Sequence, residues 1–283
     1  MAWTERQAAL LGAMGLRVWA GRPPAADAAA PAVSAEAVLL PRHPVQAAPA
    51  AATRAPAAQA PVPRVSEPAK PLLPTEPKAS SASDGLGWDA LREAVAGCRA
   101  CGLCESRTQT VFGTGHRQAG WMVVGEAPGE QEDNLGEPFV GPAGQLLDRM
   151  LAALQLTRAE DGDLPQAQRV YIANTLKCRP PRNRNPTPQE MARCEPYLVR
   201  QIELVAPRII LAMGRFAVQA LLRTDEPIGR LRGRVHQYQG VPLVVTYHPA
   251  YLLRNLPDKA KAWEDLCLAA EVAENVAARA AAR

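Results

Sequence analysis

Aromatic side chains are scarce in this 283-residue chain, at 5% of the residues, and none occurs between Ala20 and Gly87. That stretch consists largely of alanine and proline, so it offers few large side chains to bury. A segment without them cannot offset the entropy that is lost when its backbone becomes ordered. We therefore predict a disordered linker, partly of polyproline-II type, over residues 22–84, and a single domain over residues 85–283.

The sequence also lacks a long apolar run, which argues against a membrane-spanning helix. Its N-terminus has no basic segment ahead of the apolar residues, and Glu5, Arg6 and Arg17 interrupt any secretory signal. We expect a cytoplasmic protein without membrane contacts. In that reducing compartment, six cysteines favour a metal site or catalysis over disulfides. The net charge of +4 is too small to indicate nucleic-acid binding by itself.

Residues 1–21 place apolar side chains at helical spacing, among them Leu10, Met14 and Val18. The spacing predicts a short amphipathic helix. On a flexible tether, such a helix can bind an unidentified protein partner. Alternatively, it packs on its own domain or is an extension that frays. We expect the chain to be a monomer.

Beyond residue 120, short apolar runs alternate with helical patterns. The apolar runs are typical of buried strands and occupy residues 121–129, 169–176, 208–214 and 242–249. Helical patterns occupy residues 141–156, 187–205, 216–222 and a final segment from residue 258. Thr187, Pro188 and Glu190 form the capping-box pattern that begins a helix. This alternation predicts a three-layer α/β/α fold with a central, mostly parallel four-stranded sheet.

Most cysteines lie in two parts of the predicted domain. The segment CRACGLC contains Cys98, Cys101 and Cys104, while Cys178 and Cys194 flank the loop RPPRNRNPTP. A C-x2-C pair with two further thiolates suits a structural zinc ion or a [4Fe–4S] cluster. The wide spacing of the second pair favours iron–sulfur, because structural zinc sites more often have two tight C-x2-C knuckles. Unlinked buried thiols are the remaining interpretation.

Three predicted strand ends carry side chains that can act on a ligand. Glu126 and Glu132 lie in VGEAPGEQED after the first strand, Asn174 ends the second, and His248 follows the fourth. Each of them taken alone is equally well explained by a turn or a helix cap. Because ligands of parallel α/β sheets bind at the carboxyl ends of the strands, we expect these residues to meet in one site.

Several motifs in this order resemble those of the family 4 uracil-DNA glycosylases, the iron–sulfur branch of the uracil-DNA glycosylase superfamily. The motifs are C-x2-C before ESRTQTVFGTG, VGEAPGEQED, PFVGPAGQLLD, YIANTLKCRPPRNRNPTPQE and HPAYLLR. The resemblance implies a DNA repair enzyme that flips uracil out of DNA and hydrolyses its N-glycosidic bond, leaving an abasic site. It implies a [4Fe–4S] cluster on Cys98, Cys101, Cys178 and Cys194, with Cys104 at a non-ligand position.

The resemblance further implies which residues bind the uracil. Phe139 would stack on the flipped base, and Asn174 would hydrogen-bond its Watson–Crick edge. Glu132 would fill the space that the methyl group of thymine needs. Ala127 would lie against the base, at the position where the classical branch of the superfamily has an aspartate.

Catalysis would depend on charge that develops as the glycosidic bond breaks. The resemblance implies that His248 donates a hydrogen bond to uracil O2, and that Glu126 favours the cationic sugar and positions water. Because Ala127 cannot activate water, the division of work among Glu126, Glu132 and His248 stays open.

Contacts with DNA are expected on both sides of this site. Four basic residues crowd the loop after Asn174, namely Lys177, Arg179, Arg182 and Arg184. They can bind phosphates, and the position of the loop beside the expected site favours this over the alternative of a merely solvated basic loop. In HPAYLLR, Leu252 resembles a wedge that fills the gap left by the flipped base, and Arg254 would contact the backbone.

Two other functions are compatible with the sequence. The first is an iron–sulfur protein of this fold that binds uracil or DNA without efficient cleavage. A related branch bonds covalently to DNA through its histidine, but the loop TLKCRPPRNRNPTP keeps Cys178 and lacks the basic insertion of that branch. The second is a zinc-containing α/β domain with another ligand.

Overall fold

The computed structural model describes residues 83–160 and 164–281 of the chain. The predicted helix over residues 1–21 and the predicted linker over residues 22–84 lie outside these residues, except for Ser83 and Asp84, which begin a turn. Among the helices of the described part, none combines the length and the apolar composition that crossing a bilayer requires.

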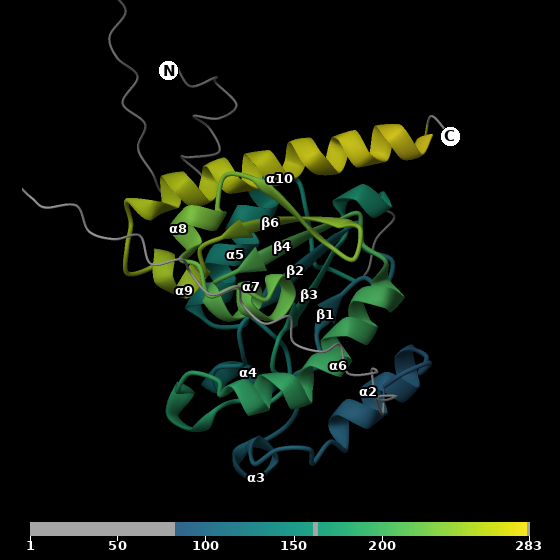
Figure 1. Ribbon diagram of the computed structural model, residues 1–283, viewed down its shortest axis with the longest axis vertical. Helices are drawn as coiled ribbons and strands as arrows, with labels where there is room; N and C mark the ends of the chain where they lie inside the picture. The colour runs from purple at the N-terminus through teal and green to yellow at the C-terminus, as the bar shows by residue number, and fades with distance from the viewer. Residues whose placement is uncertain (1–82, 161–163, 282–283) are drawn as a thin grey trace, which may run out of the picture. The chain divides into compact units, whose positions relative to one another are not determined.

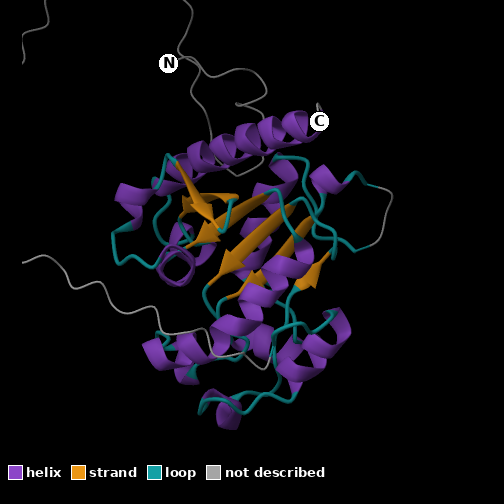
Figure 2. Ribbon diagram, turned by 45° about the vertical axis from the view of Figure 1, so that its right-hand side comes forward, coloured by secondary structure: helices purple, strands orange, loops and turns teal. Residues whose placement is uncertain are grey.

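The centre of the fold is a six-stranded sheet with the order β1-β3-β2-β4-β6-β5 (Figures 1 and 2). Its strands are β1 (Thr114–Gly115), β2 (Trp121–Gly125), β3 (Val170–Asn174), β4 (Ile209–Met213), β5 (Val235–Tyr238) and β6 (Val241–Thr246). The four inner strands run parallel, and each edge strand pairs antiparallel with its neighbour. The mostly parallel sheet is confirmed, but the predicted number of four strands is too low.

Both strands that the sequence did not predict lie at the edges of the sheet. β1 has only two residues, and β5 alternates exposed with half-buried side chains. An edge strand has a neighbour on one side only and can leave much of its surface in water, so it needs no continuous apolar run. The apolar pattern that predicts the inner strands is therefore missing from both edges.

Helices cover both faces of the sheet (Figures 1 and 2). They are α2 (Trp88–Ala96), α3 (Leu103–Ser106), α4 (Glu130–Leu135), α5 (Pro142–Ala153), α6 (Pro188–Val205), α7 (Arg215–Leu222), α8 (Ile228–Leu231), α9 (Pro249–Leu252) and α10 (Asp258–Ala281), with short 3-10 turns η1 (Gln166–Gln168) and η2 (Pro181–Asn183). α5, α9 and α10 pack on one face, and α6, α7 and α8 pack on the other. The predicted three-layer arrangement is confirmed.

The inner strands are buried on both sides. Along β2, Trp121 and Val123 contact the layer of α5 and α10, while Met122 and Val124 contact the layer of α6 and α7. Successive side chains of a strand point to opposite faces, so a strand covered twice must be apolar throughout. This requirement explains why the inner strands could be predicted from short apolar runs.

The predicted capping box begins α6. The backbone N–H of Glu190 donates to Thr187 Oγ1 at 3.2 Å, and the backbone N–H of Thr187 donates to Glu190 Oε2 at 2.8 Å. Two N–H groups that the helix cannot satisfy are thus paired. The cap fixes the point where the RPPRNRNPTP loop joins the helix that carries Cys194.

Candidate active site

A cleft of about 760 Å³ opens at the carboxyl ends of the parallel strands. Eight of the residues predicted for the site line this cleft: Glu126, Ala127, Glu132, Phe139, Asn174, Arg184, His248 and Arg254. They come from three stretches that are far apart in the sequence, residues 126–139, 174–184 and 248–254. The cleft is much larger than a single pyrimidine base, so it can also hold part of a polymer to which the base is attached.

Asn174 ends β3 and is 3% exposed. Its side-chain Oδ1 is buried and has no hydrogen-bond partner within the described part of the chain. A buried acceptor left without a donor costs about 1–3 kcal/mol, so it is typical of a site whose hydrogen bonds are completed by a ligand. A Cβ at Gly125 would lie 2.4 Å from this oxygen and 2.7 Å from Phe139 Cζ, which explains the glycine at the end of β2.

Phe139 lies in a turn with a left-handed backbone, at φ 55°. Few side chains adopt this conformation, so neighbouring groups must hold it. The Arg158 guanidinium donates to the carbonyls of Pro138 and Phe139 at 2.9 and 3.0 Å, and it is itself held by Asp148 Oδ2 at 2.8 Å. The Phe139 ring is thereby fixed beside the ring of His248, with centroids 5.3 Å apart.

Glu132 holds the same turn from the other side. Its Oε1 accepts from the backbone N–H groups of Val140 and Gly141 at 3.1 and 3.3 Å, and its Oε2 accepts from Gly129 N–H at 3.1 Å. Both carboxylate oxygens are thus engaged by main-chain donors. The geometry favours a positioning role for Glu132 over proton transfer, while its place in the cleft leaves the predicted contact with the base possible.

His248 caps the N-terminus of α9. Its Nδ1 accepts from the backbone N–H of Ala250 at 3.2 Å, so a neutral ring carries its proton on Nε2. Burial lowers the pKa of His248 to about 4, against the opposing influence of Glu132. At neutral pH the ring is therefore uncharged and can donate one hydrogen bond through Nε2–H.

Glu126 follows β2 and is half-buried at the edge of the cleft. Burial raises the pKa of its carboxyl, and Arg215, which also lines the cleft, opposes this shift. The main chain at Glu126 is fixed because its carbonyl accepts from Leu176 N–H at 3.1 Å and from the Thr175 hydroxyl. Ala127 follows without any group that can activate water.

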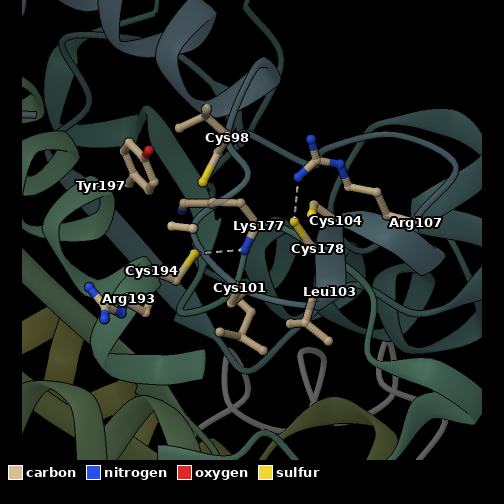
Figure 3. A pocket seen from close by; sticks show the side chains of 13 residues that line it. Cys98, Cys101, Leu103, Cys104, Arg107, Lys177, Cys178, Arg193, Cys194 and Tyr197 are labelled. Carbon is tan, nitrogen blue, oxygen red and sulfur yellow. Dashed lines mark hydrogen bonds between the residues drawn. The ribbon is translucent and has the colours of Figure 1, made fainter. Parts of the chain in front are cut away.

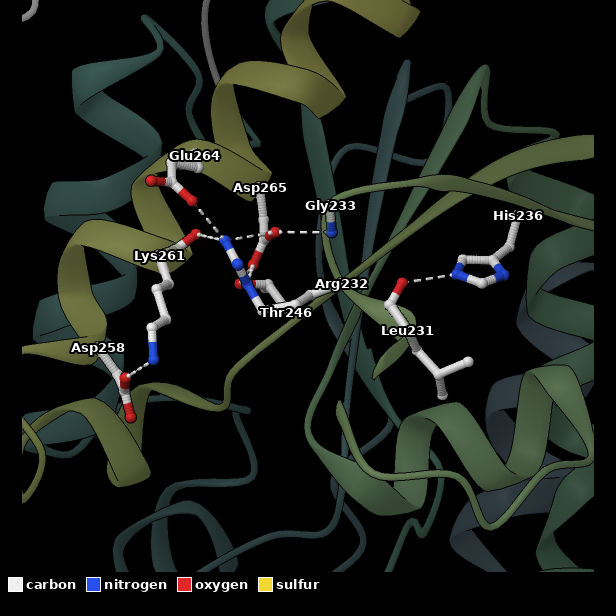
Figure 4. A network of polar contacts seen from close by, with 9 residues as sticks. All are labelled: Leu231, Arg232, Gly233, His236, Thr246, Asp258, Lys261, Glu264 and Asp265. Carbon is white, nitrogen blue, oxygen red and sulfur yellow. Dashed lines mark hydrogen bonds and ion pairs between the residues drawn. The ribbon is translucent and has the colours of Figure 1, made fainter. Parts of the chain in front are cut away.

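A buried polar network supports the end of β6 (Figure 4). Asp265 of α10 accepts from the Thr246 hydroxyl at 2.9 Å, from Arg232 Nε at 3.1 Å and from Gly233 N–H at 3.1 Å. Thr246 in turn accepts from Gly214 N–H through its carbonyl at 3.0 Å. These bonds tie the ends of β4 and β6 to α10, and His248 lies two residues beyond Thr246.

The arginines of the basic loop, predicted to contact phosphates, differ in whether they line the cleft. Arg184 lines the cleft and is bound by Glu190 through two hydrogen bonds at 2.9 and 2.6 Å. Arg182 is exposed outside the cleft, and Arg179 is half-buried, with Nε donating to Asn183 Oδ1 at 2.8 Å. Neither of the last two lines the cleft.

For Lys177 the prediction is wrong. Its side chain is 1% exposed, and its Nζ donates to the Asn174 carbonyl at 2.8 Å and to Gln201 Oε1 at 2.6 Å. A buried ammonium with these partners cannot reach a phosphate on the surface. The sequence shows a basic residue in a basic loop, but the chain bends after β3 and directs this side chain to Gln201 of α6.

The predicted wedge residue also needs correction. Leu252 is fully buried in the core beside α5 and α10, so it cannot enter DNA. The next residue, Leu253, is 42% exposed and directly precedes Arg254, which lines the cleft. Two adjacent leucines look alike in sequence, and the short helix α9 decides which one faces water.

Five of the six cysteines line a second cavity, below the RPPRNRNPTP loop: Cys98, Cys101, Cys104, Cys178 and Cys194. Figure 3 shows the sulfur atoms of Cys98, Cys178 and Cys194 turned toward a common space. Within the described residues, no three ligating side chains converge on the position of a single ion. A [4Fe–4S] cluster takes four thiolate ligands, and the five cysteines that line this cavity supply a donor set of that kind.

Donors surround these thiols. Arg107 Nη1 donates to Cys178 Sγ at 3.0 Å, and the backbone N–H of Lys177 donates to Cys194 Sγ at 3.3 Å. Burial raises the pKa of Cys178, and it raises that of Cys194 to about 12. Without a metal these thiols are protonated, whereas hydrogen-bond donors aimed at sulfur suit thiolate ligands. The residues present therefore fit a metal–sulfur group.

Comparison with known proteins bears on the whole arrangement. The model of the uracil-DNA glycosylase superfamily matches residues 112–267, more than half of the chain. The type-4 uracil-DNA glycosylase of Archaeoglobus fulgidus is 43% identical to this chain over 173 residues, which cover 58% of this chain and 82% of the relative. The type-4 enzyme of Pyrobaculum aerophilum is 40% identical over 188 residues, which cover 63% of this chain and 90% of the relative. The chain belongs to the type-4 uracil-DNA glycosylase family. The type-4 enzyme of Saccharolobus solfataricus, 40% identical over 185 residues, agrees with this, and the predicted family is confirmed.

Several cleft residues of this type-4 family member were not predicted. Arg215 begins α7 directly after Gly214, and Tyr247 and Tyr251 stack with ring centroids 5.1 Å apart. Arg215 directly follows one predicted strand and Tyr247 lies among the last residues of another, so strand-end position could have found both. Arg158, which holds Phe139, lies outside every quoted motif, so the sequence did not indicate its role in the site.

Proposed function

We propose that this type-4 family member removes uracil from DNA, with the base bound between Asn174 and Phe139. The observation that carries the proposal is the unpaired, buried Oδ1 of Asn174 in the cleft. Uracil N3–H supplies the missing donor, and the side-chain amide can donate to O4. Cytosine presents an acceptor at N3 and donors at N4, so it would leave Oδ1 unpaired if the amide keeps this orientation.

Bond cleavage follows from the state of His248 and Glu126. As the N-glycosidic bond breaks, the electron pair moves to uracil and negative charge grows on O2, toward which neutral His248 donates through Nε2–H. Ionised Glu126 favours the cationic sugar and orients the water that adds to C1′. The products are an abasic site and free uracil, which regains a proton at N1.

The reaction requires the base to leave the duplex. We propose that Arg184, Arg215 and Arg254 bind the flanking phosphates, since all three line the cleft. Leu253, rather than Leu252, would fill the space left by the flipped base, because only Leu253 is exposed. Arg182 remains a candidate for more distant phosphate contacts.

We propose that the second cavity holds a [4Fe–4S] cluster on Cys98, Cys101, Cys178 and Cys194. The donors on Cys178 and Cys194 support this assignment, as does the gathering of these four cysteines around one cavity. Cys104 lines the same cavity, so its exclusion rests on the resemblance alone. When bound, the cluster supplies a structural link: it joins the segment before α3 to the RPPRNRNPTP loop beside the active site.

The decisive experiment incubates the purified protein with a uracil-containing oligonucleotide, followed by alkali, which breaks DNA at abasic sites. Cleavage at uracil, but not at thymine or cytosine in the same position, is expected. Asn174→Ala should lose activity by a factor on the order of 10² or more, while the exposed control Asn134→Ala keeps it. Binding of uracil-containing DNA without abasic sites would instead favour the non-cleaving binding protein.

A further inference from the structure

Lys177 lies between the active site and the cysteine cavity, and the reaction as described so far does not use it. Its side chain is buried, and its Nζ donates to the main-chain carbonyl of Asn174 at 2.8 Å. Its own backbone N–H donates to Cys194 Sγ at 3.3 Å, and Cys178 is the next residue. One residue thus contacts the strand end that binds uracil and the segment that carries two of the thiols.

The charge of Lys177 has no carboxylate partner in the described part of the chain. Its Nζ binds only neutral oxygens, from Asn174 and Gln201. Arg107, which also lines the cavity, likewise bonds to Cys178 Sγ and the Ala96 carbonyl and forms no ion pair within the described residues. A buried cation is costly unless an anion lies nearby. The groups available to supply that negative charge are the thiolates of the cavity.

A metal–sulfur group supplies this countercharge when it is bound. Four thiolates around an iron–sulfur core leave the whole group negatively charged, and hydrogen bonds and nearby charges set its reduction potential. Both cations line the cavity, and Figure 3 shows Arg107 beside Cys178 and Lys177 beside Cys194. Their two positive charges therefore offset the excess charge of the thiolates.

We propose that Lys177 is a positioning residue that joins the two sites. Its ammonium offsets the negative charge of the thiolate-bound group, and the same ammonium holds the Asn174 carbonyl, which fixes the uracil-binding amide. Gln201 anchors the ammonium from α6, and itself donates to the Phe112 carbonyl at 2.9 Å. This inference rests on the proposed function, because it assigns a purpose to holding Asn174 in place.

The test compares three full-length variants with the wild type. Lys177→Met removes the charge and the hydrogen bonds, and Lys177→Arg keeps the charge in a longer, planar head group. Arg193→Met is the matched control, since Arg193 lines the same cavity but is exposed. The readouts are the midpoint potential of the cluster, its absorbance near 400 nm, and kcat and KM on a uracil-containing oligonucleotide.

Lys177→Met should shift the midpoint potential to a more negative value than Arg193→Met does, because a lost positive charge destabilises the reduced cluster. Its kcat/KM for uracil should fall about 10-fold to 100-fold. Lys177→Arg should keep a potential near that of the wild type and still lose kcat/KM, because its head group does not fit between Asn174 and Gln201. A general loss of stability would not lower the kcat/KM of Lys177→Arg while leaving its midpoint potential near that of the wild type.

An unchanged potential or an unchanged kcat/KM in Lys177→Met would overturn the inference. If Lys177→Met yields no folded protein, Lys177→Arg decides: reduced kcat/KM with the cluster retained supports the inference, and wild-type kcat/KM overturns it. A wild-type protein that contains zinc would also overturn it. If the proposed function is wrong, the wild type itself leaves uracil in the DNA. The midpoint potentials of the wild type and the variants can still be compared in that case.

Discussion

The rings of Phe139 and His248 are stacked, with centroids 5.3 Å apart and planes inclined by 28°. This separation is within the range of direct ring contact, about 4.5–7 Å, so no base fits between the two rings. A flipped uracil must use another face or the edge of Phe139. The residue proposed to support the base and the residue proposed to stabilise the leaving group are therefore already in contact with each other.

Replacing Phe139 by leucine should weaken binding of the flipped base. Stacking of a base on an aromatic ring contributes about 1–3 kcal/mol, which corresponds to an increase of roughly 5-fold to 150-fold in KM. The variant should keep its fold, because leucine fills much of the same volume. Phe112→Leu is the control, since Phe112 is buried in the same domain but does not line the cleft. Equal KM values for the two variants would contradict the stacking role.

His248 should act as a neutral donor, and the pH dependence of the reaction can reveal this. Since burial lowers the pKa of His248 to about 4, the ring is already neutral at pH 6. The single-turnover rate should therefore not fall as the pH rises from about 6 to 8, where an ordinary histidine of pKa about 6.5 loses its proton. A rate that declines over this interval would point to a charged histidine.

Below about pH 6, the same pH–rate profile should show the protonation of two groups. Protonation of Glu126 lowers the rate first, because burial raises the pKa of that carboxyl. In Glu126→Gln this step disappears, and the remaining decline toward pH 4 reports His248. Replacing His248 by alanine should cost about 10²–10³ in the single-turnover rate, as measured for other donors of this type.

The inner sheet and the place of the site follow directly from the sequence. Strands buried on both faces must be apolar throughout, and Gly125 and Asn174 mark where two of them end. Parallel strands end at the same edge of the sheet, which predicts that their terminal residues meet. The capping box at Thr187 and Glu190 was equally predictable, because it depends on residues three apart.

Other parts of the site depend on which way a side chain points, and sequence does not determine that. Lys177 and Arg184 belong to one basic loop, yet the first is buried against Gln201 and the second lines the cleft. Arg158 holds the carbonyl of Phe139, although the two residues are 19 positions apart in the sequence. Such long-range hydrogen bonds follow from the complete fold and leave no local pattern in the sequence.

The two leucines of HPAYLLR should separate stability from DNA binding. Leu253→Ala should reduce uracil removal from duplex DNA more than from single strands, because only in a duplex must the exposed side chain replace the flipped base. Leu252→Ala should instead lower the free energy of unfolding by about 2–5 kcal/mol, because it leaves a cavity in the core. Leu256→Ala, with its side chain 55% exposed, is the control for the first variant. Equal losses on both substrates for Leu253→Ala would rule out the wedge.

The network behind His248 predicts a stability effect that depends on pH. In Arg232→Met, the fully buried Asp265 loses its cationic partner and keeps only the Thr246 hydroxyl and Gly233 N–H. A buried charge left in this state costs about 3–5 kcal/mol, which denaturant unfolding at neutral pH should detect. Arg230→Met, which removes an exposed arginine of the neighbouring α8, should cost much less.

Acid should restore part of the stability lost in Arg232→Met. Burial raises the pKa of Asp265, so the folded protein binds this proton more readily than the unfolded chain does. The penalty is therefore largest above the raised pKa and fades as the pH falls toward the ordinary value for aspartate. In Arg232→Met/Asp265→Asn the side chain has no charge to bury, so the double variant should be more stable than the single one at neutral pH. A single variant as stable as the wild type would show that Asp265 does not need Arg232, and that the end of β6 is held by packing alone.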